Sequence, residues 1–405
     1  MFVPISNTPR PYAWGSTTAI AELLGSVASG GPEAELWLGA HPGSPSRILD
    51  PSAVGGARDL DEWIDSDPAT ALGGLPRLPF LMKVLAATAP LSLQAHPTAE
   101  QARLGFEREN AAGIPLDAPH RNYRDAHPKP EIIYALSETF DALCGFRPID
   151  QTRKLFEALG LDDLVPRLAS LPALFEWLMT RGPGVDELLA RVVGLTKTTE
   201  IGPDEGVAGT KVVPSEGNSV VLDAVVLDAV ETMRTLSAAY PGDAGVAAAL
   251  LLNRVTLKRG EALYLPAGNI HAYLSGLGIE VMTASDNVLR GGLTTKHVDV
   301  PELLKVLDFR PGPVPYIRPE LESAHCDVFR PGVADFVLAH VTGGARYVLS
   351  GPGIAICTAG RFTIDGGATS ATIARGESVY VTPDEAALTF TGTGELFLAT
   401  TGRIA

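Results

Sequence analysis

Three short segments of the sequence carry side chains that could bind a metal ion. In the first, LSLQAHP, Gln94 and His96 stand two residues apart in an extended apolar run. The two-residue period of a strand places both side chains on one face of a sheet, together with Ser92. Polar groups that face an apolar interior need ligands or hydrogen-bond partners. A Gln-x-His pair by itself is more often a hydrogen-bonded core histidine, so this segment alone is a weak signal.

The other two segments are HPKPEIIYAL and LPAGNIHAYLSG. Glu131 opens an apolar strand after Pro-Lys-Pro, and the prolines fix the backbone so that Lys129 and Glu131 point alike; an exposed ion pair is the alternative. His271 follows a Pro-Ala-Gly-Asn turn that places it at the start of a predicted strand. The segments together offer two imidazoles, one carboxylate and one amide oxygen, from His96, His271, Glu131 and Gln94. Such mixed nitrogen and oxygen ligation suits Zn²⁺ and is typical of a catalytic site.

The surrounding pattern predicts strands interrupted by a helical insertion. Over residues 1–150, short apolar runs are punctuated by Gly and Pro, and one helix is predicted where Thr98 and Gln101 have capping-box spacing. Over residues 151–249 the apolar period changes toward 3.6, which indicates helices. This part contains the stretch TTEIGPDEGVAGTKVVPSEGN, predicted to be a surface loop, followed by another helix over about residues 219–239.

Two segments after residue 250 repeat one another. RGEALYLPAGNIHAYLSG, residues 259–276, aligns without gaps with RGESVYVTPDEAALTFTG, residues 375–392. We interpret them as two copies of one β-barrel unit, the alternative being coincidence between two strand-turn-strand segments. His271 aligns with Ala387, so only the first copy offers a metal ligand there. The second barrel, from about Tyr316, is therefore predicted to be a structural partner that binds no metal.

Composition narrows the classes of protein. The 405 residues, 45% of them apolar, suffice for two or three domains with their own cores. A net charge of −15 disfavours nucleic acid as a partner, although a small anion can bind where a few cations converge. The three cysteines are far apart, which predicts buried free thiols. No apolar run is long enough to span a membrane and no signal-peptide pattern opens the sequence, so we expect a cytoplasmic protein.

Five motifs in order give the chain a resemblance, over its whole length, to the type I phosphomannose isomerases of the cupin superfamily. They are QAHP, HPKPE, YPGDAGV, LPAGNIHAYLSG and SDNVLRGGLTTKHVD. The resemblance implies a mainly β fold with a helical insertion, made of two cupin-like β-barrel (jelly-roll) domains and an α-helical domain. A discontinuous catalytic barrel would comprise residues 1–150 and 250–315, the helical insertion residues 151–249, and a C-terminal barrel without metal residues 316–405.

The resemblance also implies roles for individual residues. One Zn²⁺ ion per chain would be held by Gln94, His96, Glu131 and His271. The implied catalytic residues are Arg290, Lys129 and Glu280. The implied substrate-binding residues are Trp14, Glu35, Lys83, Ser92, Tyr273, Asp286 and Lys296, of which Lys83 and Ser92 match positions at the phosphate end. One departure is Pro11 in PYAWG, where many relatives have Asn, so the resemblance implies neither the conformation of that loop nor a pocket contact made by it.

The implied activity is the metal-dependent interconversion of D-mannose 6-phosphate and D-fructose 6-phosphate by a monomer, with a sugar phosphate as its small-molecule partner. A proton moves between C2 and C1 through an enediol, whose charge a metal and a cation stabilise. Arg290 suits the cationic role because its guanidinium stays protonated. Lys129, Glu280 and metal-bound water all stay open as the proton carrier. A sugar-binding cupin without catalysis and an Fe²⁺-dependent cupin dioxygenase are the alternative functions.

Overall fold

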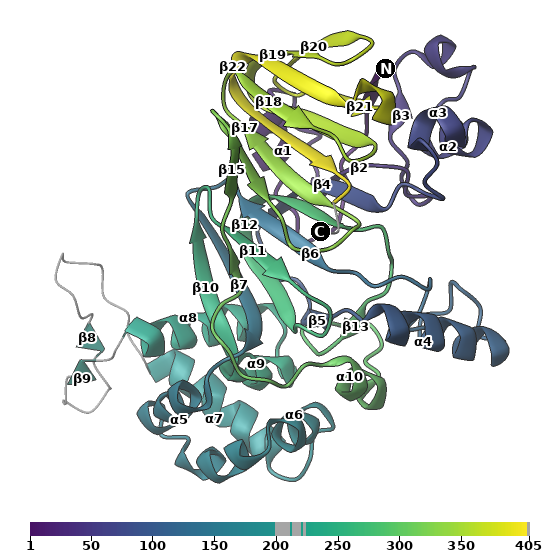
Figure 1. Ribbon diagram of the computed structural model, residues 1–405. Helices are drawn as coiled ribbons and strands as arrows, with labels where there is room; N and C mark the ends of the chain where they lie inside the picture. Colours follow the sequence, from purple (N-terminus) through teal and green to yellow (C-terminus); the bar gives the residue numbers. More distant parts are fainter. Residues whose placement is uncertain (199–210, 213–219, 222–223, 403–405) are drawn as a thin grey trace.

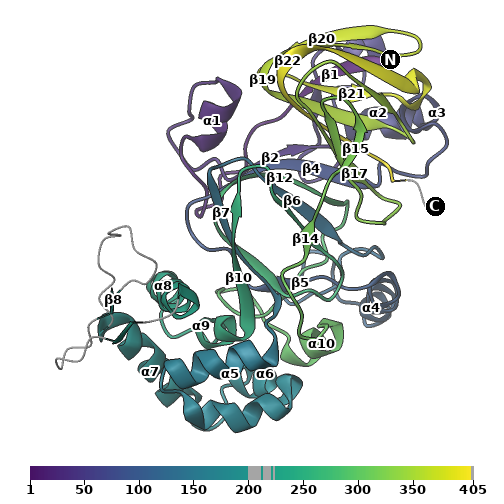
Figure 2. The ribbon, with the colours of Figure 1, turned by 60° about the vertical axis from the view of Figure 1, so that its left-hand side comes forward.

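The computed structural model describes residues 1–198, 211–212, 220–221 and 224–402. Two large antiparallel sheets and a helical region make up the molecule (Figure 1). In this view the sheet built mainly from the carboxy-terminal strands is at the top, the other sheet is in the middle, and helices α5 to α9 lie at the bottom. The view in Figure 2 keeps the same order of parts. The fold is therefore mixed α/β.

The middle sheet, which carries the chemistry, contains ten strands. They are β2 (Glu35–Leu38), β4 (Phe80–Ala87), β5 (Gln94–Ala95), β6 (Glu131–Ala135), β7 (Thr139–Phe146), β10 (Leu252–Lys258), β11 (Ala262–Leu265), β12 (His271–Thr283), β13 (Leu289–Arg290) and β14 (Tyr316–Ile317). Strand β12 organises the sheet, because its first half pairs with β5 and β7 and its second half with β4 and β6. The segments LSLQAHP, HPKPE and NIHAY thus come together on adjacent strands.

The second sheet also has ten strands. They are β1 (Phe2–Ser6), β3 (Arg47–Ile48), β15 (Glu320–Ser323), β16 (Cys326–Phe329), β17 (Val337–Val341), β18 (Ala345–Val348), β19 (Gly353–Asp365), β20 (Ser370–Ala374), β21 (Ser378–Val381) and β22 (Ala387–Thr400). The amino-terminal strand β1 pairs with β21, so the start of the chain adds to the sheet formed by its end. The three cysteines are buried free thiols, as predicted.

The largest group of helices lies, in the order of the sequence, after strand β7 and before strand β10 of the middle sheet. That group comprises α5 (Ile149–Ala158), η2 (Asp162–Ala169), α6 (Leu171–Met179), α7 (Val185–Thr198), α8 (Ala224–Ala239), α9 (Gly245–Ala248) and η3 (Ala249–Leu251). Elsewhere lie α1 (Ala19–Leu24), η1 (Pro51–Val54), α2 (Leu60–Ser66), α3 (Pro68–Leu72), α4 (Ala99–Ala111), α10 (Val300–Val306) and η4 (Pro383–Glu385). Helix α4 begins with the predicted capping box of Thr98 and Gln101. No described helix combines the length and apolar character that crossing a membrane requires.

The helix predicted over about residues 219–239 begins later than expected. Helix α8 starts at Ala224, and Val220–Val221 form strand β9, which pairs with β8 (Lys211–Val212). Two consecutive β-branched residues favour a strand over a helix start, which explains the error. Most of the loop predicted just before lies outside the described residues.

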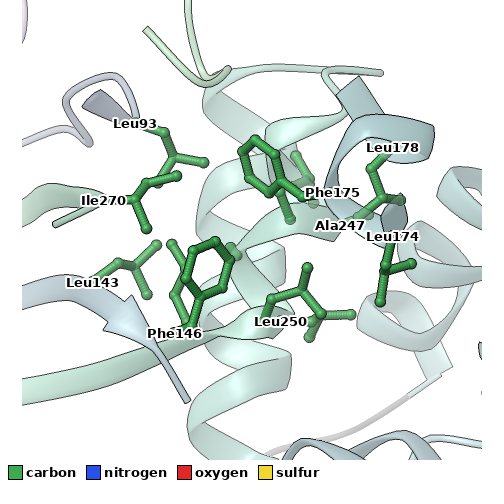
Figure 3. Packing of buried hydrophobic residues seen from close by; sticks show 14 of the residues in the cluster. Leu93, Leu143, Phe146, Leu174, Phe175, Leu178, Ala247, Leu250 and Ile270 are labelled. Carbon is green, nitrogen blue, oxygen red and sulfur yellow. The ribbon is translucent and has the colours of Figure 1, made fainter. Parts of the chain in front are cut away.

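A shared core ties the helices to the strands of the middle sheet. Figure 3 shows Phe146 of β7 and Phe175 of α6 among the leucines of this core, and the two rings meet edge to face with centroids 6.0 Å apart. Leu93 and Ile270 also point into it, and both are fully buried. Because side chains alternate along a strand, the next residues, Gln94 and His271, are directed to the opposite side. The helical core therefore anchors two segments that carry polar site residues.

The sequence repeat is confirmed as a repeat of structure. Strands β11 and β21 have equivalent bounds in the alignment, and β12 and β22 begin at the aligned residues His271 and Ala387. The turns before β11 and β21 also agree. Gly260 and Gly376 have φ angles of +92° and +88°. The backbone N–H groups of Lys258 and Ala374 each donate to the glutamate three residues later at 2.8 Å.

Candidate metal and substrate site

Three buried side chains of the middle sheet converge on one point. The ligand atoms of His96, Glu131 and His271 all lie within 4.8 Å of one another. Each imidazole Nε2 is 3.3 Å from a different oxygen of Glu131. All three side chains are 1% exposed. The structure thus brings together three of the four predicted metal ligands.

Hydrogen bonds fix both imidazoles in the tautomer that a metal ion requires. The Nδ1 atoms of His96 and His271 lie 2.7 and 3.0 Å from the backbone carbonyls of Asn287 and Asn269. A carbonyl only accepts, so each Nδ1 donates its proton and each Nε2 presents a lone pair toward Glu131. Both Nε2 atoms and Glu131 Oε2 are buried without a hydrogen-bond partner. Three acceptors facing each other with no donor fit a bound cation.

The electrostatic surroundings keep His96 and Glu131 in their metal-binding protonation states. Burial, reinforced by the Lys129 ammonium, lowers the pKa of His96 to about 4, so its imidazole is neutral at neutral pH. Burial acts to raise the pKa of Glu131, but Lys129 and the imidazoles outweigh it and hold that pKa well below its usual range. The Lys129 Nζ atom lies 2.8 Å from Glu131 Oε1, which confirms that the two side chains point alike.

Gln94 lies beside this cluster. Its backbone is paired with His271 of β12 on one side and with Arg290 of β13 on the other. Its side chain lines a cavity of about 550 Å³ next to the cluster. Its role as a fourth ligand stays a prediction.

The cavity collects most of the other predicted site residues. Those that line it are Trp14, Glu35, Lys83, Ser92, Gln94, Lys129, Asp286, Arg290 and Lys296. They come from segments spread over almost 300 residues of the chain, and the pairing around β12 brings them together. A cavity of this size accommodates a small ligand.

Two predicted residues lie behind the cavity wall. Glu280 is 3% exposed and contacts Lys83, whose Nζ atom is 2.8 Å from Glu280 Oε2 and 3.5 Å from Glu35 Oε1. Burial favours a neutral Lys83, but the two carboxylates outweigh it and raise the lysine pKa. Tyr273 is 1% exposed and packs edge-on against Phe140. Direct contact of Glu280 or Tyr273 with substrate stays a prediction.

One side of the cavity is cationic. Arg290 and Lys296 line it together with Arg124. Burial lowers the pKa of both Arg290 and Lys296, and the charge of Arg124 lowers each further. In the described part of the chain, no carboxylate forms an ion pair with any of these three cations. In a chain of net charge −15, unpaired cations that share one cavity indicate an anionic ligand.

Sequence reasoning missed several cavity residues, including Trp37, His41 and Arg124. Two of them stand in the motif ELWLGAHPG, where His41 follows shortly after strand β2. The only sequence signal for His41 as a cavity residue was its position just after a buried strand. Nothing local distinguishes it from a surface histidine, because its partner in the cavity is distant in sequence.

Comparison with known proteins identifies the family of this chain. Residues 2–149 match the family model of the phosphomannose isomerase type I catalytic domain. The chain is 37% identical over 402 residues to mannose-6-phosphate isomerase of Shigella flexneri, covering 96% of this chain and 97% of that protein. It is 33% identical over 372 residues to the Homo sapiens enzyme, covering 83% and 80%.

Solved structures give the same result. A zinc-bound crystal structure of mannose 6-phosphate isomerase superposes with a TM-score of 0.84 at 32% identity, covering 99% of this chain and all of that one. A variant of phosphomannose isomerase from Salmonella typhimurium superposes with a TM-score of 0.85 at 32% identity, with the same coverage. The chain belongs to the type I phosphomannose isomerase family.

Proposed function

We propose that this chain is a zinc-dependent isomerase that interconverts D-mannose 6-phosphate and D-fructose 6-phosphate through an enediol. One observation carries the proposal: three orphaned acceptor atoms of His96, Glu131 and His271 adjoin a cavity with unpaired cations. The acceptors fit a divalent metal and the cations fit a phosphorylated substrate.

Zinc would be held by His96, Glu131 and His271, with Gln94 as the proposed fourth ligand. When bound, it supplies Lewis-acid polarisation of a substrate oxygen. The lone pairs that receive it are already directed inward by the carbonyls of Asn269 and Asn287. Little reorganisation of the chain is then needed on binding.

The chain's own residues divide the remaining tasks. Arg290 stabilises negative charge on the enediol, because its guanidinium stays protonated and donates from a fixed fork. Of the two acid–base candidates, Lys129 lines the cavity, whereas Glu280 reaches it only through Lys83. Lys129 is therefore the better placed to move a proton between C2 and C1.

The remaining predicted residues bind and orient the sugar phosphate. Lys296, Ser92 and Lys83 are proposed for the phosphate end, and Trp14, Glu35, Tyr273 and Asp286 for the sugar. Because the Lys83 charge is already balanced by two carboxylates, Lys296 is the main phosphate contact of the three. Lys296→Ala should mainly raise KM, by about tenfold, with kcat little changed.

We further propose that each large sheet closes into a cupin-like (jelly-roll) barrel. The catalytic barrel would be formed mainly by residues 1–150 and 250–315, and the helical insertion by residues 151–249. The second barrel would be formed by residues 316–405 together with β1 and β3, which pair into that sheet. The pairing of β12 with strands on both of its flanks and the structural repeat support this architecture. We also propose that the protein is a cytoplasmic monomer, which size-exclusion chromatography with light scattering and cell fractionation would test.

The direct test is a coupled assay of the purified protein together with metal analysis. We expect mannose 6-phosphate to be converted to fructose 6-phosphate, with about one zinc per chain. Chelation should abolish turnover, and added Zn²⁺ should restore it. Binding of the sugar phosphate without turnover would instead identify a sugar-binding protein. Iron-dependent oxygen consumption would identify a dioxygenase.

A further inference from the structure

His41 makes a contact in the cavity that the sequence did not predict. Its Nε2 atom lies 3.0 Å from Oδ1 of Asp286, a residue 245 positions away in the sequence. Both side chains line the cavity, with 13% of the His41 side chain exposed and 48% of that of Asp286. The imidazole therefore reaches the carboxylate from the protein side and leaves it accessible from the cavity.

The backbone fixes which nitrogen of His41 carries the proton. The N–H of Gly43 donates to His41 Nδ1 at 3.0 Å. A backbone N–H can only donate, so Nδ1 presents its lone pair and the proton lies on Nε2, which donates to Asp286. A Cβ atom at residue 43 would lie 3.2 Å from this ring, so glycine permits the close approach. Edge-on packing against Trp37, with centroids 4.7 Å apart, holds the ring from another side.

Asp286 is held on its backbone side as well. Its N–H donates to Asp125 Oδ2 at 2.8 Å. The hydrogen bond from His41 is the main reason that the pKa of Asp286 lies below its usual value, so the carboxylate is ionised at neutral pH. His41 engages Oδ1, and within the described residues no side chain hydrogen-bonds to Oδ2. An ionised carboxylate with one oxygen available accepts hydrogen bonds from hydroxyl groups and repels phosphate.

We propose that His41 is a positioning residue that orients Asp286 to accept a hydrogen bond from a hydroxyl group of the sugar. This inference rests on the proposed function and extends it to the uncharged part of the substrate. Sugar recognition thereby depends on a histidine whose own contact is with the carboxylate. The cations serve the opposite requirement, Lys296 at the phosphate and Arg290 at the negative charge of the enediol.

Two conservative variants separate this role from a purely structural one. In His41→Gln, the amide nitrogen lies near the position of Nε2 and can donate to Asp286, but the bond from Gly43 is lost. In His41→Asn, the amide oxygen lies near Nδ1 and can accept from Gly43, but Asp286 is out of reach. We expect His41→Asn to raise KM for mannose 6-phosphate about tenfold and His41→Gln about threefold or less, since a hydrogen bond to a charged group is the stronger.

The order of the two variants decides the question. If His41 only holds its loop, His41→Gln will be the more damaging and His41→Asn nearly neutral, which would overturn the proposal. A double-mutant cycle adds a second measurement. With Asp286→Ala already present, His41→Asn should raise KM by less than twofold further, because the carboxylate that accepts from His41 is gone. If His41→Asn raised KM as much in the Asp286 variant as in the wild-type protein, the proposal would also be contradicted.

Calorimetric measurement of mannose 6-phosphate binding separates the test of the His41 role from the test of the isomerase function. Wild-type protein that binds the sugar phosphate without turnover would refute the isomerase function, and the order of Kd values would still test His41. Wild-type protein that does not bind it would refute both. Thermal unfolding and zinc content of each variant show whether folding or the metal site has changed.

Discussion

The two copies of the repeated strand pair, β11–β12 and β21–β22, have similar backbone conformations and different functional side chains. Strands β11 and β21 have equivalent bounds, β12 and β22 begin at aligned residues, and the glycine turns agree. Yet β12 begins with buried His271 and β22 with exposed Ala387. The neighbours also differ. Strand β11 runs beside β6, which supplies Glu131, whereas β21 runs beside β1 and β19. The repeat therefore preserves the backbone conformation, and the side chains of the neighbouring strands determine whether a metal site forms there.

The turn before the second strand also has a role at the metal site in the first copy and a structural role in the second. In the first copy, the carbonyl of Asn269 orients the imidazole of His271. The aligned residue in the second copy is Glu385. Its buried carboxylate accepts hydrogen bonds from the backbone of Ala368 and from the backbone and hydroxyl of Thr369. One turn thus positions a metal ligand, while the other secures a loop of the second sheet.

Exchanging the residues at the start of β12 and β22 should give the largest effect. His271→Ala removes one of three buried ligands, so zinc should be lost and turnover should fall about 10³-fold or more. Ala387→His, the matched control, should neither acquire zinc nor alter turnover, because the neighbouring strands supply no partner ligands. Metal analysis and the coupled assay measure both. Full zinc occupancy in His271→Ala would refute the ligand assignment, and zinc gained by Ala387→His would break the comparison.

Arg290→Ala tests the cation that pairing with Gln94 places beside the metal ligands. We expect kcat to fall about 10²-fold or more with zinc retained, because the lost interaction is strongest in the transition state. Arg375→Ala provides the control, since this arginine stands in the second copy and its side chain donates hydrogen bonds to the backbone carbonyls of Glu22 and Leu23. A kcat near the wild-type value for Arg290→Ala, with zinc unchanged, would remove the central residue of the mechanism.

Glu385→Gln should reduce stability and leave the kinetics unchanged. Burial tends to raise the pKa of Glu385, but hydrogen bonds from the amino group of Met1, from Thr369 and from two backbone N–H groups lower it to about 2. Because the folded-state pKa is depressed, the ionised carboxylate stabilises the fold above the unfolded-state pKa of about 4.3, and this contribution is lost as pH falls toward about 2.

For this variant we expect a loss of about 2 kcal/mol in the free energy of unfolding at pH 7, the range for hydrogen bonds to a charged group. Urea denaturation from pH 7 to pH 3 measures it. The wild-type protein should lose its advantage over the variant in acid. An equal difference between the two proteins at every pH would show that the charge of Glu385 is unimportant.

The glycines of the two turns should give the smallest effect. Both have positive φ, so replacement by alanine strains the backbone at either site. A Cβ at residue 376 would lie 2.3 Å from the carbonyl oxygen of Leu24, whereas at residue 260 the nearest atom is 3.8 Å away. Gly376→Ala should therefore destabilise the protein by about 1 kcal/mol more than Gly260→Ala. Equal midpoints of urea unfolding would mean that the two turns tolerate alanine equally.

Local patterns in the sequence determined much of this protein. The capping box of Thr98, the start of β12 at His271 and the shared orientation of Lys129 and Glu131 follow from turn chemistry and from the two-residue period of strands. The equivalence of the two copies is also readable, because it depends on residue identities at a fixed offset. Where two local preferences competed, as at Val220–Val221 before α8, the sequence alone led to the wrong helix start.

Only the tertiary structure decided which residues far apart in the chain share the cavity. The pairing order around β12 puts Glu280 behind Lys83 and Tyr273 against Phe140, so both lie behind the cavity wall. It also brings His41 to Asp286 and joins strand β1 to the sheet formed by the end of the chain. Local propensity cannot encode these contacts, because each depends on which strands pair and on what fills the space between them.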